Sequence, residues 1–179
     1  MSQPSRIPPP SGPGPRYGTD LDHACTAFEG TVVLLDGVDP LTTEIVRLRC
    51  ARYHDCRRCR SVRLEAAIEQ GFDEELGAKI DRWESSDLDE RYKAALALTD
   101  AIIMAPGAID PELRQRVRAH FTDAQIAEIC LDVMKWSVQK ALVALRIEPA
   151  AAEDHLSRLT FDEQGRFRIG GPVAAVPAG

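Results

Sequence analysis

The most informative stretch of the chain is Glu44-x11-Cys56-Arg57-Arg58-Cys59-x3-Arg63. It combines two thiols at Cys-x-x-Cys spacing with a carboxylate twelve residues before the first thiol. A thiol pair at this spacing can close into a disulfide and reopen. The upstream carboxylate supplies a candidate proton acceptor. This stretch therefore predicts a thiol-based redox site.

The local sequence predicts different surroundings for the two thiols. Asp55 is a candidate N-cap, and it would place Cys56 in the first turn of a helix that runs to about Gly71. The positive end of the helix dipole stabilises an anion, so a Cys56 thiolate is favoured there. Cys59 lies one turn further along the same helix. We therefore expect Cys59 to be the more buried thiol.

Glu44 lies in an apolar stripe with Leu41, Ile45 and Leu48. A carboxylate in such a stripe is partly desolvated, which favours the proton uptake near neutral pH that a general base requires. The alternative is a structural ion pair between Glu44 and an arginine such as Arg63, because such pairs also perturb carboxylates. The residues by themselves leave both possibilities open.

The apolar spacing between the two ends of the chain is helical, and no convincing period-2 pattern predicts a strand. Most expected helices begin at a capping residue, with proline often following. Seven helices with short connections predict an all-α bundle. The expected helices cover about 20–35, 39–53 and 55–71, a short helix from 73, one from Ser86 or Asp87 to about 105, then 110–120 and 122–145, the last opened by a Thr122–Gln125 capping box.

The bulk composition suits one folded domain, because the chain has 179 residues and 44 % of them are apolar. The net charge of −6 argues against nonspecific nucleic-acid binding, since phosphate contacts need a basic surface. No apolar run reaches the roughly 20 residues that span a bilayer. Residues 1–18 lack the apolar segment of a secretory signal. We therefore expect a cytoplasmic protein that binds neither nucleic acid nor membrane.

Proline and glycine mark the ends of the expected domain. Residues 1–18 are rich in both and predict a flexible or extended arm. The helical domain is expected over 19–150, and a C-terminal tail over 151–179. The five cysteines are an odd number, which argues against a framework of structural disulfides. Three of them are expected to be small buried core residues, namely Cys25, Cys50 and Cys130.

The spaced Glu44, Cys56 and Cys59 resemble the active-site motif of the AhpD-like, carboxymuconolactone decarboxylase superfamily. The similarity covers about residues 20–147 and includes the segments 41–48 before the thiols and 119–126 before the last helix. The resemblance implies an all-helical fold, the alkyl hydroperoxidase AhpD core, in homo-oligomers that are often trimers or hexamers. It also implies alkyl-hydroperoxidase and disulfide-reductase activity that needs no metal or organic cofactor.

The resemblance also implies a role for each motif residue. Cys59 would attack a small peroxide and pass through a sulfenic acid, which Cys56 would resolve as a disulfide. Glu44 would belong to the proton relay that ionises Cys59. An external thiol donor, such as a lipoyl group, would restore the dithiol. Helix-dipole reasoning instead favours Cys56 as the more ionised thiol. We expect Cys59 to react with the peroxide, as in the family, and Cys56 to react with the outside dithiol.

The chain departs from the family at one position. The family's histidine falls four residues after the second cysteine, where this chain has Arg63. Arginine stays protonated, so it cannot accept a proton, but its charge can stabilise a thiolate or neutralise Glu44. His54, two residues before Cys56, is a candidate substitute. Arg63 and His54 are therefore expected to tune the thiolate.

Other interpretations of the same residues remain open. Cys50, His54 and the thiol pair could supply four zinc ligands, although a second Cys-x-x-Cys or histidine pair is absent. A lyase of the carboxymuconolactone decarboxylase type would act on a small carboxylic acid without the thiol pair. A non-catalytic helical oligomer with a decayed relay is the third possibility.

Two further features bear on the surroundings of the thiols. Trp136 is expected to be a packing anchor that could also line a cavity over the thiols. The segment 47–63 contains seven arginines, which predict either a solvated face of ion pairs or a positive field that attracts an anionic substrate.

Overall fold

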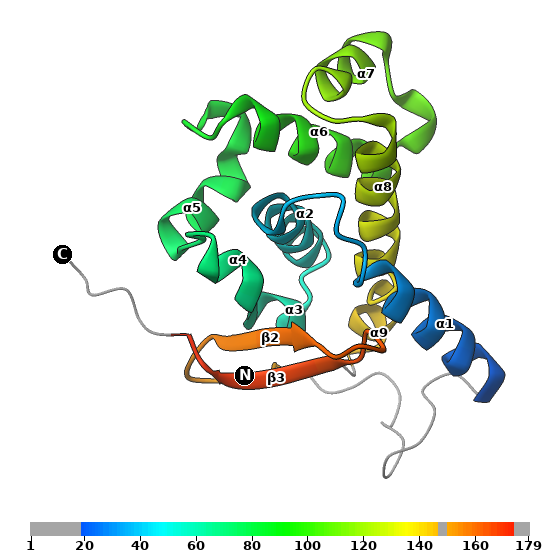
Figure 1. Cartoon of the computed structure of the whole chain (residues 1–179), viewed down its shortest axis with the longest axis vertical. Helices are drawn as coiled ribbons and strands as arrows, with labels where there is room; N and C mark the ends of the chain where they lie inside the picture. The colour runs from blue at the N-terminus through cyan, green and yellow to red at the C-terminus, as the bar shows by residue number, and fades with distance from the viewer. Residues whose placement is uncertain (1–18, 147–149, 174–179) are drawn as a thin grey trace.

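The computed structural model describes residues 19–146 and 150–173. These residues form a mostly helical fold with a small three-stranded sheet at one end (Figure 1). The arm expected over 1–18 and the last residues, 174–179, lie outside the described part. No helix in the described part is long and apolar enough to cross a membrane. The helical elements are α1 (Thr19–Val32), α2 (Pro40–Tyr53), α3 (Arg57–Arg60), α4 (Glu65–Glu69), α5 (Glu74–Lys79), η1 (Ile80–Ser85), α6 (Glu90–Met104), η2 (Pro106–Ala108), α7 (Pro111–Arg118), α8 (Asp123–Ser137) and α9 (Lys140–Leu145).

The helix α2 is the centre of the fold. Asp39 caps it as predicted, because the Asp39 carboxylate accepts the Thr42 N–H at 2.9 Å and Pro40 opens the first turn. α2 packs against α6 and α8 and also contacts α3, α4 and η1 (Figure 1). A helix with neighbours around most of its circumference buries more than one stripe. The charged side chains of Glu44 and Arg47 are therefore buried together with Ile45.

Several predicted helix starts are confirmed. Asp73 caps α5, Asp110 caps α7, and Thr122 forms the capping box with Gln125 that opens α8. Two details differ from the prediction. α6 is capped by Asp89, and the last predicted helix is divided between α8 and α9.

The prediction of one continuous helix over 55–71 is wrong. Asp55 adopts a left-handed backbone with φ 54°, which interrupts the helical path after α2. Cys56 itself caps the four-residue α3, since its Sγ accepts the Cys59 N–H at 3.2 Å. The chain then extends through a short strand before α4 begins. The two cysteines therefore lie in a tight turn between helices.

The absence of strands was also predicted wrongly. The sheet has the order β1-β2-β3, with β1 parallel to β2 and β2 antiparallel to β3. Each strand is short, and β1 finds its partner only after most of the chain has folded back, so local periodicity gives little signal. Ser157 of β2 pairs with Val62 of β1, directly after the thiol turn. The strands are β1 (Val62–Leu64), β2 (Ser157–Phe161) and β3 (Phe167–Pro172).

The turn of the β2–β3 hairpin rests on α1. Asp162 organises this turn by accepting the N–H groups of Gln164 and Arg166, both at 3.0 Å. Gly165 has φ 70° and lies against the backbone of Gly30. A Cβ on Gly30 would come within 2.8 Å of the Gln164 carbonyl oxygen. This contact between two backbones holds the hairpin across the end of the helical bundle.

Gly165→Ala tests this contact. The alanine Cβ would meet the Gly30 backbone, and the left-handed conformation costs an additional 1–2 kcal/mol, roughly, for a residue with a Cβ. We expect a lower melting temperature and faster proteolysis of the hairpin. Gly171→Ala is the matched control, because nothing lies within 4 Å of its Cβ position. Equal melting temperatures for the two variants would contradict the proposed packing.

Candidate active site

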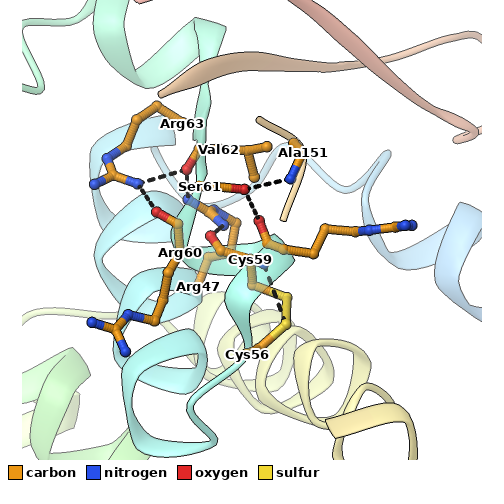
Figure 2. The surroundings of a disulfide bond; sticks show 9 residues. Arg47, Cys56, Cys59, Arg60, Ser61, Val62, Arg63 and Ala151 are labelled. Carbon is orange, nitrogen blue, oxygen red and sulfur yellow. Dashed lines mark hydrogen bonds between the residues drawn. A yellow bond between two sulfur atoms is a disulfide. The ribbon is translucent and has the colours of Figure 1, made fainter. Parts of the chain in front are cut away.

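Cys56 and Cys59 are joined by a disulfide, with their Cα atoms 5.3 Å apart (Figure 2). Cys56 is 1 % exposed, whereas Cys59 is half-buried and lines a cavity. The prediction that Cys59 is the more buried thiol is therefore wrong. The reason is the break at Asp55, which turns the chain so that the Cys56 N–H donates to the Ala51 carbonyl of α2 at 2.9 Å.

The cavity next to Cys59 has a volume of about 420 Å³. Its wall is formed by residues of α1, α2, α8, the thiol turn, β1 and the β2–β3 hairpin, and by Val138 and Gln139 between α8 and α9. Trp136 lines it, as the sequence allowed. Its apolar lining includes Val62, Trp136, Val138, Leu159, Phe161, Phe167 and Ile169. Its charged lining consists of Glu29, Arg47, Arg58, Lys135 and Arg166.

Glu44 and Arg47 form a buried ion pair behind the thiol turn. Both Glu44 oxygens accept from Arg47, at 2.6 Å from Nε and 2.7 Å from Nη2. Arg47 also donates to two backbone carbonyls, those of Cys59 and Val62, each at 2.7 Å. The two side chains are 0 % and 1 % exposed, respectively. Glu44 is thus linked to the thiol turn through Arg47, which is its ion-pair partner in place of the suggested Arg63.

Arg63 lies on another side of the turn. Its guanidinium donates to both oxygens of Glu74, at 2.6 and 2.8 Å, and to the backbone carbonyls of Arg60 and Val62. Figure 2 shows it pointing away from the sulfur atoms. Arg63 is not among the residues that line the cavity. It ties the thiol turn to α5.

His54 ends α2 and also lies outside the cavity lining. Burial, with a smaller contribution from the charge of Lys140, lowers the pKa of His54 to about 4. The imidazole is therefore neutral at physiological pH. Within the described residues, neither ring nitrogen has a hydrogen-bond partner. The structure does not bring His54 and Arg63 together at the cavity side of Cys59.

The arginines of segment 47–63 form many ion pairs, as one of the two interpretations predicted. Arg47 and Arg63 differ from that interpretation, because they are buried and not on a solvated face. Arg58 contributes to the charged lining of the cavity. The pairs are Arg47–Glu44, Arg49–Asp100, Arg52–Asp81, Arg60–Asp55 and Arg63–Glu74.

The remaining cysteines do not join this site as a metal cluster. Burial raises the pKa of Cys50 to about 12, so its thiol stays protonated. Over residues 19–146 and 150–173, no group of three or more His, Cys, Asp or Glu residues is placed to hold a metal ion. The suggested zinc ligands are thus not brought together. Cys25 is half-buried and lines the cavity, which the sequence did not predict.

Lys135 is the residue of the site that the sequence analysis missed. It is 5 % exposed and lines the cavity together with Cys59. Its Nζ lies 3.0 Å from the centroid of the Trp136 ring and 5.5 Å from that of Phe161. No described carboxylate forms a salt bridge with it. Burial lowers the pKa of Lys135 to about 7; the charge of Arg47 acts in the same direction, while Glu29 and Asp132 oppose it.

A signal for Lys135 was present in the sequence. Glu128, Asp132 and Lys135 follow each other at helical spacing and are all buried in α8. They run beside the buried apolar residues of the same helix. A charged stripe beside an apolar one indicates a helix that buries both. Burial and the nearby Glu128 raise the pKa of Asp132 to about 7.

Comparisons with known proteins agree with this fold. No family model matches the chain. Two uncharacterized Mycobacterium tuberculosis proteins, MT2376 of strain CDC 1551 / Oshkosh and Rv2313c of strain ATCC 25618 / H37Rv, are each 33 % identical over 156 residues. The alignment covers 86 % of this chain and 55 % of each relative, so the chain spans about half the length of these relatives.

Solved structures show the same arrangement of helices. The Agrobacterium tumefaciens protein ATU0492, of unknown function and with a suggested role as an antioxidant defence protein AhpD, has a TM-score of 0.64 at 19 % identity, over 74 % of this chain and 92 % of its own. An AhpD-core, peroxidase-related protein from Ralstonia eutropha JMP134 has a TM-score of 0.60 at 16 % identity, over 74 % and 72 %. A cysteine-to-alanine variant of the debrominase Bmp8, bound to 2,3,4-tribromopyrrole, has a TM-score of 0.60 at 15 % identity, over 74 % and 72 %.

The chain therefore has the AhpD-like fold of these solved structures. The expected mostly helical, AhpD-like bundle is confirmed, with the small sheet as an addition. The expected oligomeric state stays a prediction.

Arg47→Met tests the buried ion pair. It removes the guanidinium and leaves the Glu44 carboxylate and two carbonyls buried without a partner, which typically costs about 3–5 kcal/mol. We expect that loss in the free energy of unfolding, measured with urea. Arg60→Met, which breaks the exposed pair with Asp55, should cost about 1 kcal/mol or less. Similar losses in both variants would rule out the central role of Arg47.

Lys135→Met tests the cost of burying the amine. The unfolded chain holds the Lys135 proton up to about pH 10.5, whereas the folded protein releases it near pH 7. The wild type therefore gains stability with rising pH in this window, by at most about 1.4 kcal/mol per pH unit. The methionine variant lacks this gain.

The stability advantage of Lys135→Met should be largest at pH 7 and shrink toward pH 10. Urea unfolding at several pH values measures it. Lys140→Met is the control, because Lys140 is exposed on α9 and should give a difference independent of pH. A constant difference for Lys135→Met as well would contradict the lowered pKa.

Proposed function

We propose that this chain is a thiol-dependent reductase of organic hydroperoxides or disulfides that uses the Cys56–Cys59 pair. One observation carries the proposal: the pair forms a disulfide in which Cys59 alone lines a cavity and Cys56 is buried behind it. This arrangement gives a substrate access to one sulfur and keeps the second within bonding distance. The AhpD-like fold supports the same class of chemistry.

The first step is attack by the Cys59 thiolate on the outer peroxide oxygen. The O–O bond breaks, and its electron pair leaves with the alkoxide, which takes up a proton and becomes an alcohol. The sulfur loses two electrons and becomes a sulfenic acid, while the peroxide gains the two electrons.

The second step is attack by Cys56 on the Cys59 sulfur. The S–O bond breaks, water leaves with the proton of the Cys56 thiol, and the disulfide forms. An external dithiol, such as a lipoyl group, then attacks the disulfide and returns two electrons and two protons. Because Cys56 is buried, we place this attack at Cys59, which differs from the expectation from the sequence.

In this proposal Glu44 is a positioning residue. It orients Arg47, and Arg47 binds the carbonyls of Cys59 and Val62, so the thiol turn keeps its shape when the disulfide opens. A relay role for Glu44 would need a proton path past the Arg47 guanidinium. Thiolate tuning by Arg63 and His54 stays a prediction.

The cavity supports a substrate with an apolar body. More of its lining surface is apolar than polar, and its volume suits a small organic molecule. Trp136 is 7 % exposed, and within the described residues nothing accepts a hydrogen bond from its indole N–H. A peroxide or alcohol oxygen could accept it. The expected partners are thus a small organic peroxide or disulfide, a thiol donor and further copies of the chain.

Thiol titration tests the proposal. In the reduced protein, which has five thiols, one equivalent of cumene hydroperoxide should leave three. Cys59→Ser should abolish this loss, because the nucleophile is gone. Cys56→Ser should leave a sulfenic acid on Cys59 that dimedone traps and mass spectrometry detects.

Cys130→Ser is the matched control, since Cys130 does not line the cavity. It should still lose two thiols. If neither cumene hydroperoxide nor oxidised lipoamide changes the thiol count, a non-catalytic helical oligomer is the better account. Consumption of a small carboxylic acid by Cys56→Ser would favour the decarboxylase-type lyase.

A further inference from the structure

Peroxide reduction needs a group in the cavity that can both take up and give back a proton. The cations Arg47, Arg58 and Arg166 keep their protons at any physiological pH. The position of the family's histidine is occupied by Arg63, which is bound to Glu74 outside the cavity. Among the charged lining residues, Glu29 and Lys135 are left as groups that can exchange a proton.

We propose that Lys135 is the proton acceptor and donor for Cys59 in this cavity. This inference rests on the proposed function, because it assigns a residue to the proton transfer of that reaction. Lys135 and Cys59 line the same cavity of about 420 Å³, from α8 and from the thiol turn. This shared cavity gives the amine and the sulfur a common space for proton exchange.

The surroundings of Lys135 suit an amine that changes its charge. The side chain is 5 % exposed, its Nζ faces two aromatic rings, and no described carboxylate forms a salt bridge with it. A salt-bridged lysine would stay protonated, as Lys79 does between Glu75 and Asp87. The lowered pKa of Lys135, about 7, agrees with this geometry.

Charged groups face the site from several of the elements around it. Glu29 of α1 and Asp132 of α8 favour the ammonium, whereas Arg47 of α2 opposes it. Two more cations line the cavity, Arg58 of α3 and Arg166 of the hairpin turn. The excess of cations favours an anion at Cys59 and a neutral amine at Lys135.

The proton balance of the step is closed. The neutral amine takes the Cys59 thiol proton, which leaves a thiolate beside an ammonium. The thiolate attacks the peroxide, the O–O bond breaks, and the departing alkoxide takes the proton from the ammonium. The products are an alcohol, a Cys59 sulfenic acid and the neutral amine, so Lys135 ends in the form in which it began.

Two reactions of Cys59 separate proton transfer from simple charge stabilisation. Alkylation by iodoacetamide needs the thiolate, but its iodide leaving group needs no proton. Reduction of cumene hydroperoxide needs the thiolate and also a proton for the alkoxide. Lys135→Met removes both functions, whereas Lys135→Arg retains a cation that cannot exchange a proton.

The experiment measures both rates at Cys59 by mass spectrometry, in the reduced 179-residue chain at pH 7. Lys135→Met should slow both reactions by about 10-fold or more. In Lys135→Arg, the alkylation rate should stay within about threefold of the wild-type rate, while peroxide reduction should slow by about 10-fold or more. The alkylation rate of the wild type should rise with pH near 7, and in Lys135→Met this rise should move to higher pH. Lys140→Met should react at the wild-type rates. Circular dichroism checks that each variant is folded, and Lys135→Gln serves as a second neutral variant.

Unchanged rates in Lys135→Met and Lys135→Gln would overturn the inference. Equal peroxide rates in Lys135→Arg and the wild type would also overturn it, because charge alone would then suffice. A wild type that ignores peroxide, but whose Cys59 alkylation slows in Lys135→Met, would sink the proposed peroxidase function and support the control of the thiolate by Lys135. If the wild type and Lys135→Met reduce peroxide equally fast, the proposed peroxidase function is supported and the role of Lys135 is overturned.

Discussion

The buried guanidinium of Arg47 is the constraint on which the site depends. It donates hydrogen bonds to the Glu44 carboxylate and to the backbone carbonyls of Cys59 and Val62. A charge inside a protein is tolerated only when its partners are complete. The central helix and the thiol turn must therefore keep one relative position. That position in turn decides which sulfur faces the cavity.

The C-terminal hairpin completes the site from a distant part of the chain. Ser61, directly after α3, accepts the Ala151 N–H on its Oγ at 2.8 Å (Figure 2). Its carbonyl accepts the Ser157 N–H at 3.0 Å. β2 then pairs with β1, and the hairpin turn reaches Gly30 of α1. The hairpin thus supplies part of the apolar wall around a half-buried cysteine. Without it, Cys59 and Lys135 would be more exposed to water, and the amine would lose the main cause of its low pKa.

Local sequence signals predicted much of the helical framework. Asp39-Pro40, Asp73, Asp110-Pro111 and the Thr122–Gln125 box act on the nearest turn, so they are visible without knowledge of the fold. The disulfide-forming spacing of Cys56 and Cys59 is local for the same reason. The helix across Asp55 was predicted wrongly, because an aspartate at a candidate cap position does not reveal that its own backbone is left-handed.

The sequence by itself determined where several of the helices begin, that two thiols can join, and that an acid lies near them in the chain. Only the tertiary structure decided that Cys56 is buried and Cys59 accessible, that Glu44 binds Arg47, and that Lys135 shares the cavity. The physical reason is the distance along the chain over which each interaction acts. Caps and Cys-x-x-Cys spacing act over one turn. Glu44 and Arg47 are also one turn apart, but the burial of their pair depends on the packing of α2 against α6 and α8. The cavity likewise depends on distant segments, such as those joined by the Ser61–Ala151 hydrogen bond across 90 residues.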